Sequence, residues 1–174
     1  MNFNKKIAII IVNWKQYELT INCLLSLEKL EYKNFKVIIV DNESNFEKIN
    51  KIKSGFTKVE VIESKENLGF ASANNIGIKY AIKNKFEYVM LLNNDTEVNK
   101  EFLTPLLNSF QNDNSLGAVQ PLIMNYNNRA KVWNAGGYLN NFFGFPYTNK
   151  SNNKNQQIDW ITGCCILLKT KVIK

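Results

Sequence analysis

The sequence predicts an α/β protein with a mostly parallel central sheet and helices on both faces. Short apolar runs, typical of strands covered on both faces, alternate with longer segments whose apolar residues recur at helical spacing. Asparagine or aspartate stands at or just beyond the end of four of these runs. Strands separated by helices of this length form right-handed βαβ units, so the four strand ends should share one edge of the sheet.

The first part of the chain contains four predicted strands joined by helices. The strands cover residues 7–13, 35–40, 59–62 and 87–92. The helices between them cover residues 17–30, 46–53 and 70–84. Gly77 lies inside the last of these helices, where glycine costs about 1 kcal/mol relative to alanine. Close packing of that helix on the sheet would explain the glycine.

A fourth helix is predicted over residues 100–111, but Pro105 lies inside it. Proline in a helix interior removes a backbone hydrogen bond. A helix that begins at Pro105, with Thr104 as N-cap and a separate turn before it, is therefore the better of two solutions, although the apolar spacing fits both.

Beyond residue 115 the pattern of alternating strands and helices weakens. We expect a short strand at 117–121, asparagine-rich loops at 125–130 and 140–157, and an apolar strand or turn–strand unit at 158–169. Asparagine makes up about one residue in six of the whole chain, well above ordinary usage. We interpret this abundance as compositional bias rather than as part of a mechanism.

Composition excludes several classes of protein. At 174 residues the chain is expected to form one domain, and no apolar run reaches the roughly 18 residues needed to span a bilayer. There is no histidine, which argues against zinc hydrolases and against enzymes with a Ser–His–Asp triad or a Cys–His pair. Cys23, Cys164 and Cys165 lack the spacing of a disulfide framework, so we interpret them as buried small hydrophobic residues in a reducing compartment.

The net charge of +7 comes almost entirely from lysines, which are scattered along the chain. A basic surface attracts nucleic acid, anionic membranes or phosphorylated ligands. Arg129 is the only arginine, and no nucleic-acid reading motif is present, so nucleic acid is not expected as a partner. A solvated lysine-rich surface is favoured, and shallow contact with anionic lipid is the alternative.

Polar residues at the four strand ends mark the predicted ligand site, because open α/β sheets bind nucleotides at the carboxyl edge of their strands. These residues are Asn13, Asp41, Asn42, Asn67, Gly69, Asn93, Asn94 and Asp95. A carboxylate such as Asp95 can hold a divalent cation, and the cation can hold a diphosphate. Simpler interpretations are a turn residue for Asp41 and a helix N-cap for Asp95. Four ends in register favour ligand binding.

Two common nucleotide-binding motifs are missing from the sequence. The first strand lacks the G-x-G-x-x-G of dinucleotide folds, and there is no G-x-x-x-x-G-K loop. Gly69 instead precedes a helix whose N-terminus favours anions. Asn74 and Asn75 lie on that helix, and at least one of them is expected to face the ligand edge.

Taken together, these segments resemble the family 2 glycosyltransferases with a GT-A fold. The matching segments are I-I-I-V-N-W at 9–14, V-D-N at 40–42, N-L-G-F-A-x-A-N-N-x-G-I at 67–78 and L-L-N-N-D-T at 91–96. Two further segments, V-W-N-A-G-G at 132–137 and D-W-I-T-G-C at 159–164, resemble the rhamnosyltransferase-like subgroup. The similarity runs from about residue 6 to residue 170.

The resemblance implies one GT-A domain over residues 1–174, with a nucleotide-sugar-binding half at about 6–115 and the start of an acceptor-side region at about 116–174. It implies inverting transfer of a sugar from a UDP- or dTDP-sugar donor to a glycan or lipid-linked glycan acceptor, as in polysaccharide and cell wall biosynthesis. Asp41 would contact the nucleoside, and Asn93 and Asp95 would hold Mg²⁺ or Mn²⁺ against the diphosphate. Trp160, Thr162 and Gly163 would shape the acceptor side.

The sequence departs from the family pattern at three places. Asn93 replaces the first aspartate of the D-x-D motif, which should weaken metal binding before the donor arrives. Asn74, which we include among the donor-binding residues, stands where many relatives carry arginine. The family's general base is an acidic residue beyond the T-G-C block, and Asp159 does not occupy its motif position. We therefore expect a C-terminally truncated enzyme without its general base.

Two alternatives remain open. The chain could be a non-catalytic module that binds a nucleotide sugar, or a nucleotidyltransferase that makes one. A nucleotidyltransferase normally has a glycine-rich loop after its first strand, where this chain has Asn13-Trp14-Lys15. The expected location is the cytoplasm, with a peripheral position at the inner face of the plasma membrane as the alternative.

Overall fold

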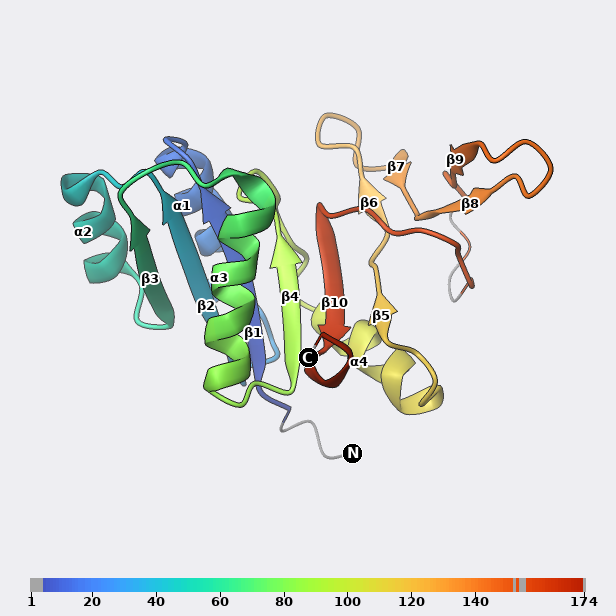
Figure 1. Ribbon diagram of the computed structural model, residues 1–174, viewed down its shortest axis with the longest axis horizontal. Coiled ribbons are helices and arrows are strands. Elements are labelled where there is room, and N and C mark those ends of the chain that lie inside the picture. The colour runs from blue at the N-terminus through green and yellow to red at the C-terminus, as the bar shows by residue number, and fades with distance from the viewer. Residues whose placement is uncertain (1–4, 152, 154–155, 174) are drawn as a thin grey trace.

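The computed structural model describes residues 5–151, 153 and 156–173, and it is built around a six-stranded sheet with the strand order β3-β2-β1-β4-β10-β5 (Figure 1). The strands of this sheet are β1 (Ile7–Asn13), β2 (Phe35–Asn42), β3 (Val59–Ser64), β4 (Tyr88–Leu92), β5 (Ala118–Val119) and β10 (Cys165–Lys169). The helices are α1 (Tyr17–Glu28), α2 (Phe46–Gly55), α3 (Gly69–Lys83) and α4 (Leu103–Asn112), followed by a short 3₁₀ turn, η1 (Thr170–Val172).

Strands β1 to β4 run parallel, and β10 is antiparallel to both of its neighbours, β4 and β5. The predicted mostly parallel sheet is therefore confirmed. The register pairs Asn13 with Asp41, and Asn42 with Ser64. Because parallel strands end at the same edge, the polar residues that follow β1, β2 and β4 meet there, as the sequence predicts.

Helices cover both faces of the sheet, as expected. On one face, apolar residues of α1, α2 and α4 pack with Ile9, Ile11 and Ile39 into the larger core. On the other face α3 lies across β1 and β2, and Figure 1 shows it in green in front of the sheet. A Cβ atom at Gly77 would come within 2.5 Å of Cγ2 of the buried Ile10, which confirms that the glycine lets α3 approach the sheet.

The predicted start of the fourth helix is wrong. Helix α4 begins at Leu103, and Pro105 is its third residue. The first-turn N–H groups of a helix have no intrahelical partner, so proline removes nothing there. Thr104 does not cap the helix, because it is the second residue of α4 and Phe102 occupies the N-cap position.

Beyond residue 115 the strands are short and pair in two small ladders. β6 (Ile123–Met124) pairs with β7 (Val132–Asn134), and β8 (Gly137–Leu139) pairs with β9 (Pro146–Thr148). The prediction of a continuous loop over residues 140–157 is therefore wrong at β9. Of the predicted unit at 158–169, only residues 165–169 form a strand. None of the helices in the described parts of the chain is long and apolar enough to cross a bilayer.

Candidate nucleotide-sugar site

The turn after β4 is fixed by hydrogen bonds to both backbone groups of Asn93. The N–H of Asn93 donates to the carbonyl of Cys164 over 2.9 Å, and the Thr96 hydroxyl donates to the Asn93 carbonyl over 2.6 Å. Strands β4 and β10 are antiparallel, and Leu92 at the end of β4 pairs with Cys165 at the start of β10. The bond between Asn93 and Cys164 extends this pairing by one residue beyond each strand. Asn93, Asp95 and the Thr162–Cys164 segment are thereby brought to one place.

A buried chain of side-chain hydrogen bonds runs beneath this edge. The Asn94 amide donates to the Thr20 hydroxyl over 3.2 Å, and that hydroxyl donates to Oδ1 of Asn13 over 2.8 Å. The Asn13 amide in turn donates to Oδ1 of Asp41 over 2.5 Å. Asn13, Thr20 and Asp41 are fully buried. Buried polar groups are costly unless they are paired, so this chain of bonds ties β4, α1, β1 and β2 together.

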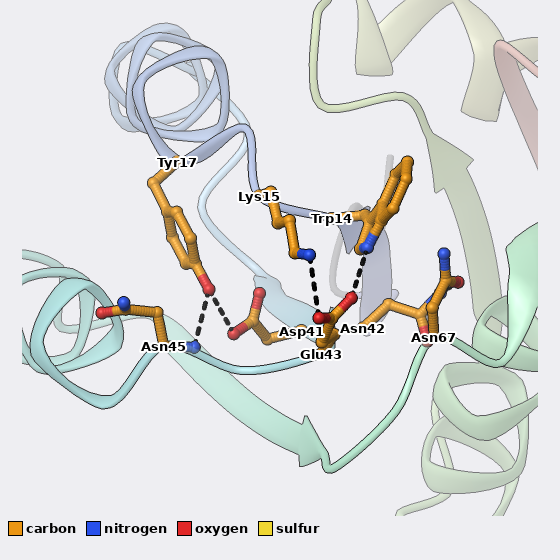
Figure 2. Close-up of polar contacts among 8 residues, drawn as sticks. All are labelled: Trp14, Lys15, Tyr17, Asp41, Asn42, Glu43, Asn45 and Asn67. Atoms are coloured by element: carbon orange, nitrogen blue, oxygen red, sulfur yellow. Dashed lines mark hydrogen bonds and ion pairs between the residues drawn. The ribbon is translucent and has the colours of Figure 1, made fainter.

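Tyr17 completes the buried arrangement. Its hydroxyl donates to Oδ2 of Asp41 over 2.9 Å and accepts the backbone N–H of Asn45 over 2.9 Å (Figure 2). Burial raises the pKa of Tyr17 to about 12, so its hydroxyl stays protonated and remains a donor at neutral pH. Both carboxylate oxygens of Asp41 are therefore occupied by protein donors.

The expected contact between Asp41 and the nucleoside does not fit this arrangement. Asp41 is 0% exposed, and its two oxygens are bonded to Asn13 and Tyr17. Its carboxylate stabilises the edge from inside the protein and is not accessible to a ligand on the surface. Sequence alone could not show this, because the two donors come from β1 and α1, more than twenty residues earlier in the chain.

The solvent-facing side of this edge is formed by the exposed Trp14 and Lys15 and the half-buried Glu43 (Figure 2). The Trp14 indole N–H donates to Oε2 of Glu43 over 2.9 Å, and the Lys15 ammonium pairs with Oε1 over 2.8 Å. The bond from Lys15, followed by the bond from Trp14, holds the pKa of Glu43 below its usual value. Lys15 and Glu43 have left-handed backbones, with φ of 59° and 85°. Such strain in non-glycine residues gathers at functional sites.

Sequence reasoning did not assign this cluster of Trp14, Lys15 and Glu43 to the site. The available signal was position, because Trp14 and Lys15 directly follow Asn13, and Glu43 directly follows Asn42. What the sequence could not show is that residues 29 positions apart bond across the edge.

Asn42 and Asn67 hold the start of α3 at the end of β2. The Asn42 amide donates to Oδ1 of Asn67 over 2.6 Å, and Oδ1 of Asn42 accepts the N–H of Leu68 over 2.8 Å. Gly69, with φ of 76°, donates its N–H to Oδ1 of Asn67. Asn42 is 2% exposed, whereas Asn67 and Gly69 are exposed. Asn67 and Gly69 are therefore the members of this group that a ligand can reach.

Asn74 is buried within α3 and donates its amide to the carbonyl of Phe70 over 2.9 Å. Its nitrogen is therefore used inside the helix, whereas Asn75 is exposed. We expected Asn74 to contact the nucleotide sugar, whereas its amide nitrogen is bonded within its own helix. Asparagine side chains readily bond the carbonyl one turn earlier, and this local bond competes with a ligand.

The residues after β4 fit a divalent cation held jointly with a diphosphate. Asp95 is exposed, and within the described residues its carboxylate makes no hydrogen bond or ion pair. The amide oxygen of Asn93, in the same turn, is of the hard type that such cations bind. No cluster of three or more His, Cys, Asp or Glu residues occurs in the described ranges. Mg²⁺ commonly binds through one or two carboxylates plus substrate phosphates, so a single carboxylate is sufficient.

Of the three predicted acceptor-side residues, two lie beside the edge. The N–H of Thr162 donates to Oε1 of Gln120 over 2.8 Å, and Gln120 in turn donates to Asn134. Gly163 lies next to the Phe70 ring, since a Cβ atom there would be 3.7 Å from it. Trp160 packs instead against Gly137 of β8. It therefore supports the β8–β9 ladder.

The three thiols lie around the end of β4, and all have raised pKa values. Burial raises the pKa of Cys23 to about 12 and that of Cys164 to about 11, and it also raises the pKa of Cys165. All three stay protonated at neutral pH and are weak nucleophiles. The prediction of buried hydrophobic cysteines is confirmed for Cys23 and Cys165, but it is wrong for Cys164, which is partly exposed.

Comparison with known proteins agrees with this geometry. The sequence profile described as glycosyl transferase family 2 matches residues 8–174. A dTDP-rhamnosyl transferase, RfbF, of Shigella flexneri is 30% identical over 112 residues, which are 64% of this chain and 37% of that protein. A low-salt glycan biosynthesis hexosyltransferase, Agl10, of Haloferax volcanii is 31% identical over 120 residues, which are 68% of this chain and 37% of that protein.

A solved structure shares the fold. It is the mannosyltransferase PcManGT from Pyrobaculum calidifontis in complex with GDP-Man and Mn²⁺, with a TM-score of 0.62 and 17% identity over 74% of this chain and 38% of that one. The chain thus spans less than two-fifths of the length of each of these proteins. Its six ordered segments, the shared strand edge and the profile match over nearly its full length lead to one conclusion: the chain belongs to glycosyl transferase family 2.

Proposed function

We propose that the edge formed by β1, β2 and β4 binds a UDP- or dTDP-linked sugar and that the protein transfers this sugar with inversion. The observation that carries the proposal is the exposed carboxylate of Asp95, which has no partner among the described residues and lies beside the Thr162–Cys164 segment. The relative from Shigella is a dTDP-rhamnosyl transferase, which favours dTDP-rhamnose among the donors. The donor half comprises residues 6–115, and the acceptor side begins at residue 116.

The nucleobase is proposed to lie on the cluster of Trp14, Lys15 and Glu43. Trp14 is 51% exposed, and its indole edge is fixed by Glu43. The Lys15 ammonium lies over its ring, 5.6 Å from the centroid, so a planar base would stack on the ring face that Lys15 leaves open. Asp41 and Asn13 act from beneath by keeping β1 and β2 in register. Asn67 offers an exposed amide at the start of α3, where the helix N-terminus favours a negatively charged ligand, and Gly69 lets the backbone turn there.

Asp95 and Asn93 are proposed to hold Mg²⁺ or Mn²⁺ together with the diphosphate. When bound, such a cation neutralises charge that develops on the departing nucleoside diphosphate. Asn94 supports the turn, because its amide is bonded to Thr20. The Pyrobaculum structure is a complex with GDP-Man and Mn²⁺, which supports the choice of a divalent cation for this fold.

The acceptor is proposed to be a glycan or a lipid-linked glycan that approaches along Thr162 and Gly163. Gly163 faces Phe70 and leaves room there, since its missing Cβ would sit at van der Waals distance from the ring. A lipid-linked acceptor would place the protein at the inner face of the plasma membrane. No described residue is assigned as the general base.

The test is calorimetric titration of dTDP and UDP into the chain with and without Mn²⁺. We expect Mn²⁺ to tighten nucleotide binding by about tenfold or more, because the cation would be held by the protein and by the diphosphate together. Asp95→Asn should remove the Mn²⁺ effect. Asp113→Asn, at the far end of α4, should keep it, because that acid only caps a turn at Ser115.

Circular dichroism would first show that each variant is folded. Metal-independent binding that is the same in Asp95→Asn and in the unchanged chain would contradict the assigned cation site. If a folded chain bound neither nucleotide, the proposed donor edge itself would be wrong.

A further inference from the structure

The β8–β9 hairpin presents an aromatic surface that the donor site does not use. Residues 139–148 are all exposed, and they include Phe142, Phe143 and Phe145, which are 87%, 65% and 70% exposed. We call these three phenylalanines the aromatic tip. Figure 1 shows the loop that carries them at the upper right, on the side of the molecule away from α2 and β3.

The turn beneath the aromatic tip is built rather than irregular. Oδ1 of Asn140 accepts the backbone N–H groups of Phe142 and Phe143, each over 3.0 Å. The Asn140 carbonyl accepts the N–H of Gly144, and the Asn140 N–H donates to the Phe145 carbonyl. Gly144 has φ of 70°, which a β-branched or bulky residue would rarely adopt. The three rings are therefore held outward by a fixed backbone.

This hydrogen bonding also satisfies donors that would otherwise have to remain in water. The N–H groups of Phe142, Phe143 and Gly144 all have partners within the turn. An unsatisfied backbone N–H is costly in an apolar medium. The aromatic tip can therefore leave water without losing hydrogen bonds at those three positions.

The hairpin is anchored to the rest of the acceptor-side region. The Tyr138 and Tyr147 rings stack across its strands with centroids 5.5 Å apart, and the Asp159 carboxylate accepts the N–H of Leu139. Gly137 packs directly against Trp160. The hairpin is therefore joined to the segment that leads to Thr162 and Gly163.

Most of the net positive charge of the chain comes from the same part of the sequence, because acidic residues are scarce there. Residues 116–174 contain seven of the 22 basic residues but only one of the 15 acidic residues, Asp159. The first 115 residues are nearly neutral by the same count. A region with this excess of positive charge is attracted to anionic lipid over roughly a Debye length, whereas uncharged glycan would gain nothing from it.

We propose that the aromatic tip inserts into the interfacial layer of an anionic lipid bilayer. Aromatic rings favour the boundary between headgroups and acyl chains, and basic residues around them add attraction to anionic headgroups. One part of this proposal rests on the proposed function, namely that the lipid contact brings the acceptor side to a lipid-linked acceptor. Lipid binding itself requires no nucleotide.

The experiment measures flotation of the chain with vesicles of phosphatidylcholine alone and with vesicles that also contain phosphatidylglycerol. We expect binding to the anionic vesicles, weakened by salt. The triple change Phe142→Ser, Phe143→Ser and Phe145→Ser should lower the binding constant by about tenfold or more, because the apolar contribution is lost. Phe46→Ser, which removes a phenylalanine that is 75% exposed on α2, should leave it unchanged.

Insertion is checked separately from adsorption. Phe142→Trp should acquire fluorescence quenching by lipids brominated in their acyl chains, beyond the quenching seen for the unchanged chain. Equal vesicle binding by the triple variant, or no vesicle binding by the unchanged chain, would overturn the proposal. So would concentration-dependent dimers that the triple variant abolishes without any vesicle binding, because the aromatic tip would then cover a second copy.

The same variants separate this proposal from the donor site. If both proposals hold, the triple variant loses vesicle binding but keeps Mn²⁺-dependent nucleotide binding. Vesicle binding that depends on the aromatic tip in a chain that binds no nucleotide would leave the lipid contact standing and refute the donor site alone.

Discussion

Residues 7–115 and residues 116–173 are stabilised in different ways. The first region has strands of five to eight residues and helices of ten to fifteen, which bury a continuous apolar core. Strands β5 to β9 of the second region have only two or three residues each, and ten consecutive residues of that region are exposed. The first region therefore depends on buried apolar area, and the second on individual hydrogen bonds.

Asparagine carries many of those individual bonds in the second region. The side chains of Asn125, Asn128, Asn134, Asn140 and Asn149 each accept a backbone N–H two or three residues further on. Such side-chain turns replace regular secondary structure. Asparagine therefore has a structural use in this region, while the interpretation of its abundance as compositional bias stays a prediction.

The largest effect is expected from removing a buried carboxylate of the first region. Asp41→Ala leaves the Asn13 amide and the Tyr17 hydroxyl buried without a partner, so we expect a loss of about 3 kcal/mol in the free energy of unfolding. Asp159→Ala removes one exposed acceptor from Leu139 and should cost less than about 1 kcal/mol. Urea unfolding followed by fluorescence would measure both, and equal losses would erase the contrast between the regions.

A smaller effect is expected where α3 meets the sheet. Gly77→Ala places a methyl group 2.5 Å from Cγ2 of Ile10, and the resulting overpacking should outweigh the better helix propensity of alanine by about 1–2 kcal/mol. Gly55→Ala meets nothing within 4 Å and serves as the matched control. A stabilised Gly77→Ala in thermal unfolding would show that the core of the first region yields more easily than its packing implies.

The smallest effect concerns backbone strain. The first region places Lys15, Glu43 and Lys85 at positive φ in addition to Gly69, whereas the positive-φ residues described in the second region are the glycines Gly136 and Gly144. Glu43→Gly relieves strain but loses the bonds to Trp14 and Lys15 at the protein surface, so the free energy of unfolding should rise or stay unchanged. Gly144→Ala imposes strain of about 1 kcal/mol.

Nucleotide binding distinguishes the two strain variants. If Glu43→Gly kept full affinity for dTDP and UDP in calorimetry, the strain at Glu43 would have no part in the donor site. Gly144→Ala should keep that affinity, because it lies in the β8–β9 hairpin.

The sequence predicts the first region well because its signals are local. Helices α1, α2 and α3 and strands β1 to β4 lie within about two residues of their predicted ranges, since apolar periodicity reports burial directly. Prediction from the sequence fails where residues far apart in the chain determine the local structure. Strand β9 (Pro146–Thr148) pairs with β8, but its sequence shows no alternating pattern that would predict a strand. The Asp41 carboxylate is held inside the protein by its hydrogen bonds with Asn13 and Tyr17.

The site divides in the same way. The strand-end rule predicts which turns gather at the edge, so Asn93 and Asp95 lie where expected, while their binding of a cation stays a prediction. It does not predict which side chains of a turn are exposed. Asn42 and Asn74 are buried, and Glu43 takes the more exposed place. That choice depends on tertiary hydrogen bonds.

The position of β10 has a consequence for the order in which the protein is made. β10 pairs with β4 although about 70 residues separate them along the chain. On the ribosome, β4 therefore emerges with β1 as its sheet neighbour and waits with its other side open, a state prone to wrong pairing. The Asn93 N–H can bond the Cys164 carbonyl only after residue 164 has been made, so the donor edge forms later than the four parallel strands.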